Sequence, residues 1–129
     1  MASPQELMKI GQQLAESFQN GTTKEMRTQL YAKDCVSAEA APMPGMESAE
    51  AAGLEAIEGK NAWWDSVNEV HDMKVQGPFI HGDNKISFYF EVDATNKESG
   101  ERSQMKEVAQ YFVNQDGKIE REEFSYALG

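Results

Sequence analysis

The sequence predicts an α+β domain in which three helices pack on one side of an antiparallel sheet. The strongest evidence is a hairpin, because two alternating runs of apolar and polar residues between Met105 and Tyr126 flank Asp116-Gly117, a typical tight turn. Before residue 71, apolar residues recur at helical spacing in three separate segments. The chain has 129 residues, which is the usual size of one domain, so we expect a single domain over residues 1–129.

Each predicted helix has a recognisable start or end. The first begins at Ser3–Glu6, which has the residue types of a capping box with proline at the first helical position, and it ends at Asn20-Gly21. The second is shorter and begins at Thr22 or Thr23. The third covers Gly53 to Val70 and is expected to pack on the sheet.

The predicted strands lie between and after these helices. A short extended run covers Cys35 to Ala41, and the segment Met43 to Gly53, which contains proline and glycine, is interpreted as a loop over the mouth of a pocket. Further strands are expected at Met73 to Ile80 and at Lys85 to Val92, followed by the hairpin. The last four strands would form an antiparallel meander.

The composition argues against several classes of partner. The chain has 22 acidic and 12 basic residues and a net charge of -10, which repels nucleic-acid backbones and anionic lipid surfaces. No segment has the roughly 20 apolar residues that span a bilayer, and the N-terminus lacks the pattern of a signal peptide. The single cysteine, Cys35, is expected to be a buried, inert thiol. We therefore expect a cytoplasmic protein that binds neither nucleic acid nor membrane.

Four short segments carry a resemblance to a known family. They are Gln19-Asn20-Gly21 at the end of the first helix, Leu30 to Val36 before the first strand, Gly53 to Ile57 in the third helix, and Asn114 to Ile119 in the hairpin. In this order and spacing, the chain resembles the SnoaL-like branch of the nuclear transport factor 2-like superfamily. The resemblance implies a cone-shaped barrel, with three helices packed in the concave face of a strongly curved, mostly antiparallel sheet. It leaves the function open, because this superfamily includes isomerases, dehydratases, cyclases, epoxide hydrolases and proteins without known catalysis.

The concave face of such a sheet would supply the core at its narrow end and a ligand cavity at its wide end. In the first hairpin strand, four alternate residues are placed on this face, namely Glu107, Ala109, Tyr111 and Val113. If Gly117 forms a bulge, the inward residues of the second strand are Glu120, Glu122, Phe124 and Tyr126. Without that bulge, they are Ile119, Arg121, Glu123 and Ser125.

Three glutamates are the candidate catalytic residues. A carboxyl group in a partly apolar cavity has a raised pKa and acts as a general acid or base near neutral pH, which favours Glu107 and Glu122. Glu39, on the short first strand, is a third candidate. The alternative for each is a position at the rim of the sheet in water. The candidate pocket residues are aromatic, and each has simple packing as its alternative: Trp64, Phe88, Phe90, Tyr111 and Tyr126.

The resemblance also suggests what this chain lacks. Ketosteroid isomerases of the superfamily carry a general-base aspartate immediately before a proline, and the matching position here is Ala41. Their oxyanion-binding tyrosine and hydrogen-bonding aspartate match Leu14 and Ala109. Steroid isomerisation by that constellation is therefore disfavoured, and Glu39 on the same strand is the remaining substitute for the base.

The histidines and acidic pairs give no metal-site pattern. His81 lies in a predicted turn and His71 follows the third helix, so we interpret both as structural, with a pocket position for His71 as the alternative. The chain has no cluster of histidine and cysteine, no HExxH spacing and no glycine-rich phosphate loop. We expect neither a metal ion nor a cofactor.

Three functions are compatible with these residues. The first is an isomerase, dehydratase or cyclase that acts on a small apolar carbonyl compound, with the glutamates moving protons. The second is a domain that binds a small ligand without catalysis, and the third is a dimerisation domain whose cavity is filled by residues such as Phe88 and Phe90. An open cavity above about 300 Å³ with a carboxylate at its base would favour the enzyme, an uncharged one the binding domain, and a filled one the dimerisation domain.

The convex face of the sheet is a predicted interface. If the hairpin has the bulge at Gly117, four apolar or aromatic residues face outward there: Tyr89, Val108, Phe112 and Ile119. Surface of this kind is usually covered, and members of the resembled superfamily commonly pair sheet to sheet. We therefore expect a homodimer through this face.

Overall fold

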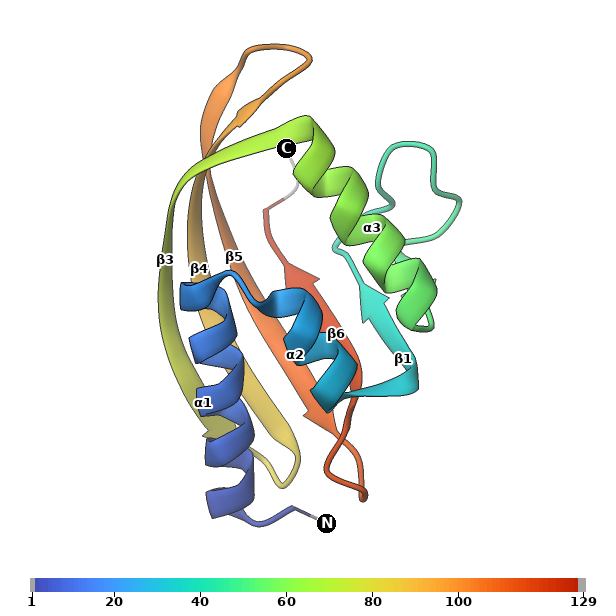
Figure 1. The fold of residues 1–129 in the computed structure, drawn as a ribbon, viewed down its shortest axis with the longest axis vertical. Coiled ribbons are helices and arrows are strands. Elements are labelled where there is room, and N and C mark those ends of the chain that lie inside the picture. The colour runs from blue at the N-terminus through green and yellow to red at the C-terminus, as the bar shows by residue number, and fades with distance from the viewer. Residues whose placement is uncertain (1, 128–129) are drawn as a thin grey trace.

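The computed structural model describes residues 2–127 and confirms the predicted α+β class. Three helices, α1 (Pro4–Asn20), α2 (Thr23–Leu30) and α3 (Leu54–Val67), lie in the concave face of a curved sheet (Figure 1). The six strands are β1 (Tyr31–Ala38), β2 (Glu50–Ala52), β3 (Asn68–His81), β4 (Lys85–Asn96), β5 (Arg102–Val113) and β6 (Ile119–Ser125). Their order in the sheet is β2-β1-β6-β5-β4-β3. The pair β1–β6 is parallel and the other neighbouring pairs are antiparallel.

The start and end of α1 follow the predicted signals. The Ser3 side chain accepts a hydrogen bond from the backbone of Glu6, and the Glu6 side chain accepts one from the backbone of Ser3. Gly21 ends the helix in the left-handed region at φ 69°, where a residue without a side chain is least strained. The chain then turns into α2, which begins at the predicted Thr23.

Several strand boundaries differ from the predictions. The first strand begins at Tyr31 rather than Cys35, and the segment predicted as a loop contains β2, which pairs with β1 through Val36 and Ala52. A strand of three residues is too short to show a period in the sequence. β3 begins at Asn68, five residues earlier than predicted, because its first part is largely exposed and carries no apolar alternation.

Both hairpin registers considered from the sequence are wrong in part. Val113 pairs with Ile119 and Phe112 pairs with Arg121, so the extra residue of the bulge is Glu120 rather than Gly117. The bulge reverses the alternation of β6, so that both Ile119 and Glu122 are buried while Glu120 is exposed. Ile119 therefore belongs to the core and not to the convex face. The inward placement predicted for Ala109, Tyr111 and Val113 is confirmed, since all three are buried.

The core lies between α1 and the middle of the sheet. Leu7, Ile10 and Leu14 project from one face of α1 and are buried. They belong to the same hydrophobic cluster as the inward residues of β4, which are Ile86, Phe88, Phe90, Val92 and Ala94. Because α1 fills only part of the concave face, α2, α3 and the long upper ends of the strands border the remaining space (Figure 1).

Candidate functional site

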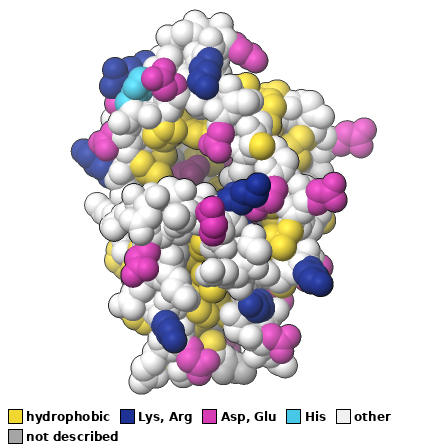
Figure 2. Space-filling model, viewed as in Figure 1, with side chains coloured by type: hydrophobic (Ala, Val, Ile, Leu, Met, Phe, Trp, Pro, Cys, Tyr) yellow, Lys and Arg dark blue, Asp and Glu magenta, His cyan; other side chains and the backbone are white. Residues whose placement is uncertain are grey.

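A cavity of about 240 Å³ opens between the helices and the sheet. Figure 2 shows a hollow in the upper part of this face, bordered by hydrophobic side chains, with an acidic side chain recessed inside it. The walls are mostly apolar and come from all three helices and five strands, including Phe18, Met26, Trp64, Phe90, Met105 and Phe124. The cavity volume is smaller than the roughly 300 Å³ that we expected for an enzyme. The cavity is nevertheless open, and carboxyl groups line it.

Glu107 reaches the cavity from β5, where it lies directly across from Phe90 of β4. Its carboxyl group makes no hydrogen bond with another residue in the range 2–127. Burial raises its pKa from 4.5 to about 7, and the negative charge of Glu39 adds to the rise, while Lys60 opposes it. Glu107 therefore exchanges a proton with its surroundings near neutral pH, as a general acid or base must.

Glu122 is the most deeply buried of the three candidate glutamates, at 3% exposed. Its register on β6 places it beside Ser37 of the parallel strand β1. The Ser37 hydroxyl donates to Glu122 Oε2 at 2.6 Å, and the Tyr31 hydroxyl donates to the other carboxyl oxygen. Burial raises the pKa of Glu122 although both donors and the charge of Lys60 lower it.

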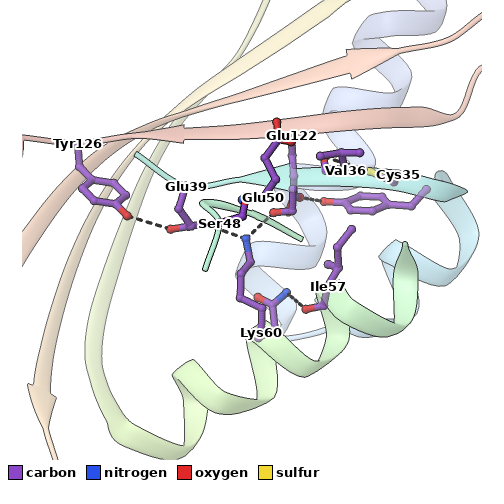
Figure 3. Close-up of polar contacts among 12 residues, drawn as sticks. Cys35, Val36, Glu39, Ser48, Glu50, Ile57, Lys60, Glu122 and Tyr126 are labelled. Atoms are coloured by element: carbon purple, nitrogen blue, oxygen red, sulfur yellow. Dashed lines mark hydrogen bonds and ion pairs between the residues drawn. The ribbon is translucent and has the colours of Figure 1, made fainter. Parts of the chain in front are cut away.

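Lys60 extends from α3 and joins Glu122 to Glu39. Its ammonium donates to Ser37 Oγ at 2.5 Å and to Glu39 Oε2 at 2.8 Å, and the side chain is nearly enclosed. Tyr126 donates to the second Glu39 oxygen at 3.1 Å. Figure 3 shows the resulting chain of contacts, which runs from Tyr126 through Glu39 and Lys60 and reaches Glu122 by way of Ser37. These bonds tie α3 to β1 and β6 along one wall of the cavity.

Arg27 of α2 is the second cation that lines the cavity. Its guanidinium donates to both carboxylate oxygens of Glu58, at 2.7 and 2.8 Å, in a two-pronged pair. This pairing lowers the pKa of Glu58. The charge of Arg27 is therefore already compensated by a carboxylate of α3.

Tyr111 has a hydroxyl group that no residue of the described chain contacts by a hydrogen bond. The residue is only 2% exposed, and every fully enclosed polar side-chain atom in residues 2–127 has a partner. The Tyr111 oxygen must therefore open onto the cavity, which Tyr111 lines. Burial raises the pKa of Tyr111 well above 10, so the hydroxyl stays protonated and remains a donor.

The structure places most of the predicted site residues together. Six of them line the cavity, namely Glu39, Trp64, Phe90, Glu107, Tyr111 and Glu122. Phe88 does not, because its side chain is buried in the core against the rings of Phe18, Phe90 and Tyr111. Tyr126 lies outside the lining and reaches it only through Glu39.

Four polar residues of the site were missed from the sequence: Arg27, Tyr31, Ser37 and Lys60. A signal for Lys60 was available, because it follows Ile57 by three residues and precedes Trp64 by four, which puts all three on one helix face. No comparable signal marked Arg27, whose partner Glu58 is far away in sequence.

The remaining reactive residue types lie outside the cavity. His71 and His81 are exposed on β3, where their Nε2 atoms lie 2.7 Å from Thr95 Oγ1 and 2.6 Å from Ser87 Oγ. Cys35 is buried, and burial raises its thiol pKa to about 12, which agrees with an inert thiol. Within residues 2–127, no three acidic, histidine or cysteine side chains are arranged to hold a metal ion, and no helix could cross a membrane.

The chain is similar to several known proteins. A family model described as a SnoaL-like domain matches residues 5–126. A solved structure from Mesorhizobium loti, named as a putative SnoaL-like polyketide cyclase, shares 32% identity, with a TM-score of 0.81 over 98% of this chain and 100% of that one. No curated protein matches.

Two more distant structures show the same fold. A Mycobacterium tuberculosis protein in complex with estradiol-17β-hemisuccinate has 17% identity and a TM-score of 0.73 over 95% of each chain. A computationally designed 17-OHP binder has 19% identity and a TM-score of 0.68 over 95% of this chain and 94% of its own.

Replacing Glu107 by glutamine is expected to change how stability depends on pH. Between about pH 4.5 and the raised pKa of about 7, the folded protein holds a proton that the unfolded chain has released, so the free energy of unfolding falls as pH rises. Glu107→Gln removes this loss and is expected to stabilise the protein by roughly 2 to 3 kcal/mol at about pH 8, with little change at about pH 4.

Urea unfolding at the two pH values measures this effect. Glu98→Gln, in an exposed turn, is the matched control and is expected to change stability equally little at both. Equal stability of Glu107→Gln and wild type at the higher pH would show that the Glu107 carboxyl group has an ordinary pKa.

Proposed function

The chain belongs to the SnoaL-like domain family, and from that premise we propose that it is an enzyme that moves a proton on a small, mostly apolar carbonyl compound. The observation that carries this proposal is Glu107, a carboxyl group with a pKa of about 7 and no hydrogen-bond partner among residues 2–127, in a largely apolar cavity. Because its pKa lies near physiological pH, such a group can both accept a proton from carbon and give it back.

Two residues of β5 would share the chemistry. The Glu107 carboxylate would remove a proton from the carbon next to the carbonyl group, which leaves negative charge on the carbonyl oxygen. The free hydroxyl of Tyr111 would donate a hydrogen bond to this oxygen and stabilise the charge. If protonated Glu107 returns the proton to another carbon, the reaction is an isomerisation. If it gives the proton to a hydroxyl group on the next carbon, that group leaves as water, a carbon–carbon double bond forms, and the reaction is a dehydration.

Glu39 and Glu122 would support the site rather than transfer protons. Each is held by two donors, Glu39 by Lys60 and Tyr126, and Glu122 by Ser37 and Tyr31. A carboxyl group with both oxygens engaged is a poor partner for a substrate proton. Their charges instead raise the pKa of Glu107.

The size and walls of the cavity favour a small apolar ligand. At about 240 Å³ it lies below the about 300 to 1,000 Å³ usual for drug-sized ligands, so a molecule of one or two rings is the better fit. The fold also accommodates apolar ring systems elsewhere, since the structure from Mycobacterium tuberculosis holds estradiol-17β-hemisuccinate.

Hydrogen exchange tests the proposal without knowledge of the natural substrate. The protein is incubated with 1-tetralone in D₂O, and NMR follows deuterium incorporation beside the carbonyl group. Wild-type protein is expected to accelerate the exchange, Glu107→Gln to lower that acceleration by about 100-fold or more, and Glu98→Gln to leave it unchanged. Binding of 1-tetralone without accelerated exchange would contradict the enzyme and support a domain that binds ligands without catalysis.

We further propose that the protein is a homodimer through the convex face of the sheet. Phe79 and Val108 are 55% and 47% exposed there, and Tyr89, which pairs with Val108, and Phe112 lie on the same face. An exposed apolar patch of this kind across β3, β4 and β5 is typical of an interface between subunits.

Size-exclusion chromatography with light scattering, at tens of micromolar protein, measures the assembly. Wild type is expected to be dimeric and Val108→Lys monomeric, because the substitution places a charge in the patch. Gln12→Lys, on the exposed side of α1, is the control and is expected to remain dimeric. A monomeric wild-type protein would contradict the proposed interface.

A further inference from the structure

We propose that the same cavity binds organic ammonium ions with an apolar body, excludes organic anions of the same size, and is blocked as a proton-transfer site when an ammonium ion occupies it. The inference rests on the ligand cavity of the proposed function. The preference for ammonium ions over anions does not require that the protein catalyses a reaction, whereas the block of proton transfer does.

The charged groups around the cavity are predominantly acidic. Four carboxyl groups line it, belonging to Glu39, Asp65, Glu107 and Glu122, against the two cations Arg27 and Lys60. Glu39, Glu107 and Glu122 are buried or half-buried, so water screens their charges less than it screens that of the exposed Asp65. A positively charged ligand therefore enters a favourable field, and a negatively charged one an unfavourable field.

The charge of each cation is already balanced by a carboxylate of the protein. Arg27 donates to both carboxylate oxygens of Glu58, and Lys60 donates to Glu39 and Ser37. A ligand carboxylate that approaches either cation therefore also approaches its acidic partner, and the repulsion between the two carboxylates opposes binding.

A cation, in contrast, finds acceptors that no other described residue uses. The Glu107 carboxyl group and the Tyr111 hydroxyl oxygen both face the cavity from β5 without a hydrogen-bond partner in residues 2–127. An ammonium group donates to both kinds of oxygen. Tyr111 is only 2% exposed, lines the cavity and has no hydrogen-bond partner for its hydroxyl group among residues 2–127, which indicates a ligand contact independently of the carboxyl groups.

Aromatic side chains beside these acceptors add a second source of attraction. Phe90 pairs with Glu107 across the sheet, and Trp64 lines the cavity from α3. The faces of such rings attract cations, and the apolar body of the ligand would pack against the methionines Met26, Met43, Met73 and Met105. The cavity thus combines an acidic acceptor with the walls that an apolar amine requires.

Binding of an ammonium ion would also change the protonation of Glu107. The ion favours the charged carboxylate, so binding near neutral pH releases a proton and tightens as pH rises through about 7. Three charged groups of the cavity act on the pKa of Glu107: Glu39 and Glu122 raise it and Lys60 lowers it. The other titratable groups that line the cavity are Arg27, Tyr31, Asp65 and Tyr111. Once paired, the carboxylate is a weaker base, which explains why the ammonium ion blocks proton transfer.

Three compounds with the same two-ring system test the inference, namely 1-aminotetralin, 1-tetralone and 1,2,3,4-tetrahydro-1-naphthoate. Calorimetric titration at about pH 7.5 is expected to show the amine binding at least about tenfold more tightly than the ketone, with no measurable binding of the carboxylate. The amine is also expected to inhibit the exchange of 1-tetralone competitively. Repeating the titration in buffers of different ionisation enthalpy is expected to reveal the released proton.

Glu107→Gln removes the negative charge of the side chain and keeps its shape. Glu107→Gln is expected to reduce the affinity for the amine to within about threefold of that for the ketone, whereas Glu98→Gln retains the preference. Should Glu107→Gln fail to fold, the comparison of the three compounds on wild-type protein still decides the charge preference.

The outcomes also separate this inference from the proposed function. A carboxylate that binds as tightly as the amine, or an amine preference that survives in Glu107→Gln, would overturn the inference even if 1-tetralone is exchanged. Tight, Glu107-dependent amine binding without any exchange of 1-tetralone would support the inference and contradict the enzyme. Failure of all three compounds to bind would overturn both.

Discussion

The buried carboxyl group of Glu122 has to be compensated inside the protein, and much of the wall around the cavity is arranged to do so. An uncompensated charge at such a position costs several kcal/mol. Ser37 and Tyr31 of β1 supply the donors, which ties the parallel strand β1 to β6. Lys60 then connects Ser37 to Glu39 and brings α3 against the same strand. The contacts around this one buried carboxyl group thus hold together α3, β1 and β6, which are distant in sequence.

Because these polar groups bind one another, few polar groups of the cavity remain free to contact a ligand. Arg27, Lys60, Glu39 and Glu122 are all engaged with other residues. Glu107 and Tyr111 are the groups on β5 that are not, and both open onto the apolar cavity. The paired residues fix the shape and field of the site, while the unpaired ones are available for contact and chemistry.

The fold was predicted well where a local sequence pattern, such as a helix cap or a regular spacing of apolar residues, dominates a segment. The capping box of α1, the start of α2 and the inward face of β5 all follow from local patterns and are confirmed. Prediction failed where two elements had to be combined. The bulge at Glu120 shows no local signature, so Ile119 was assigned to the wrong face, and β2 exists only because β1 lies beside it. Lys60 and Arg27 acquire their roles from partners far away in sequence, which periodicity does not reveal.

The chemistry of the site depends on the protonation of Glu107 near neutral pH, which carboxyl ¹³C NMR measures. Protein labelled at the glutamate side-chain carboxyl carbon is titrated, and the Glu107 resonance is assigned by its loss in Glu107→Gln. A midpoint of about 7 is the predicted result. A midpoint near the ordinary value of about 4.5 would contradict the account, because Glu107 would then be a solvated carboxylate with no special capacity to exchange protons at neutral pH.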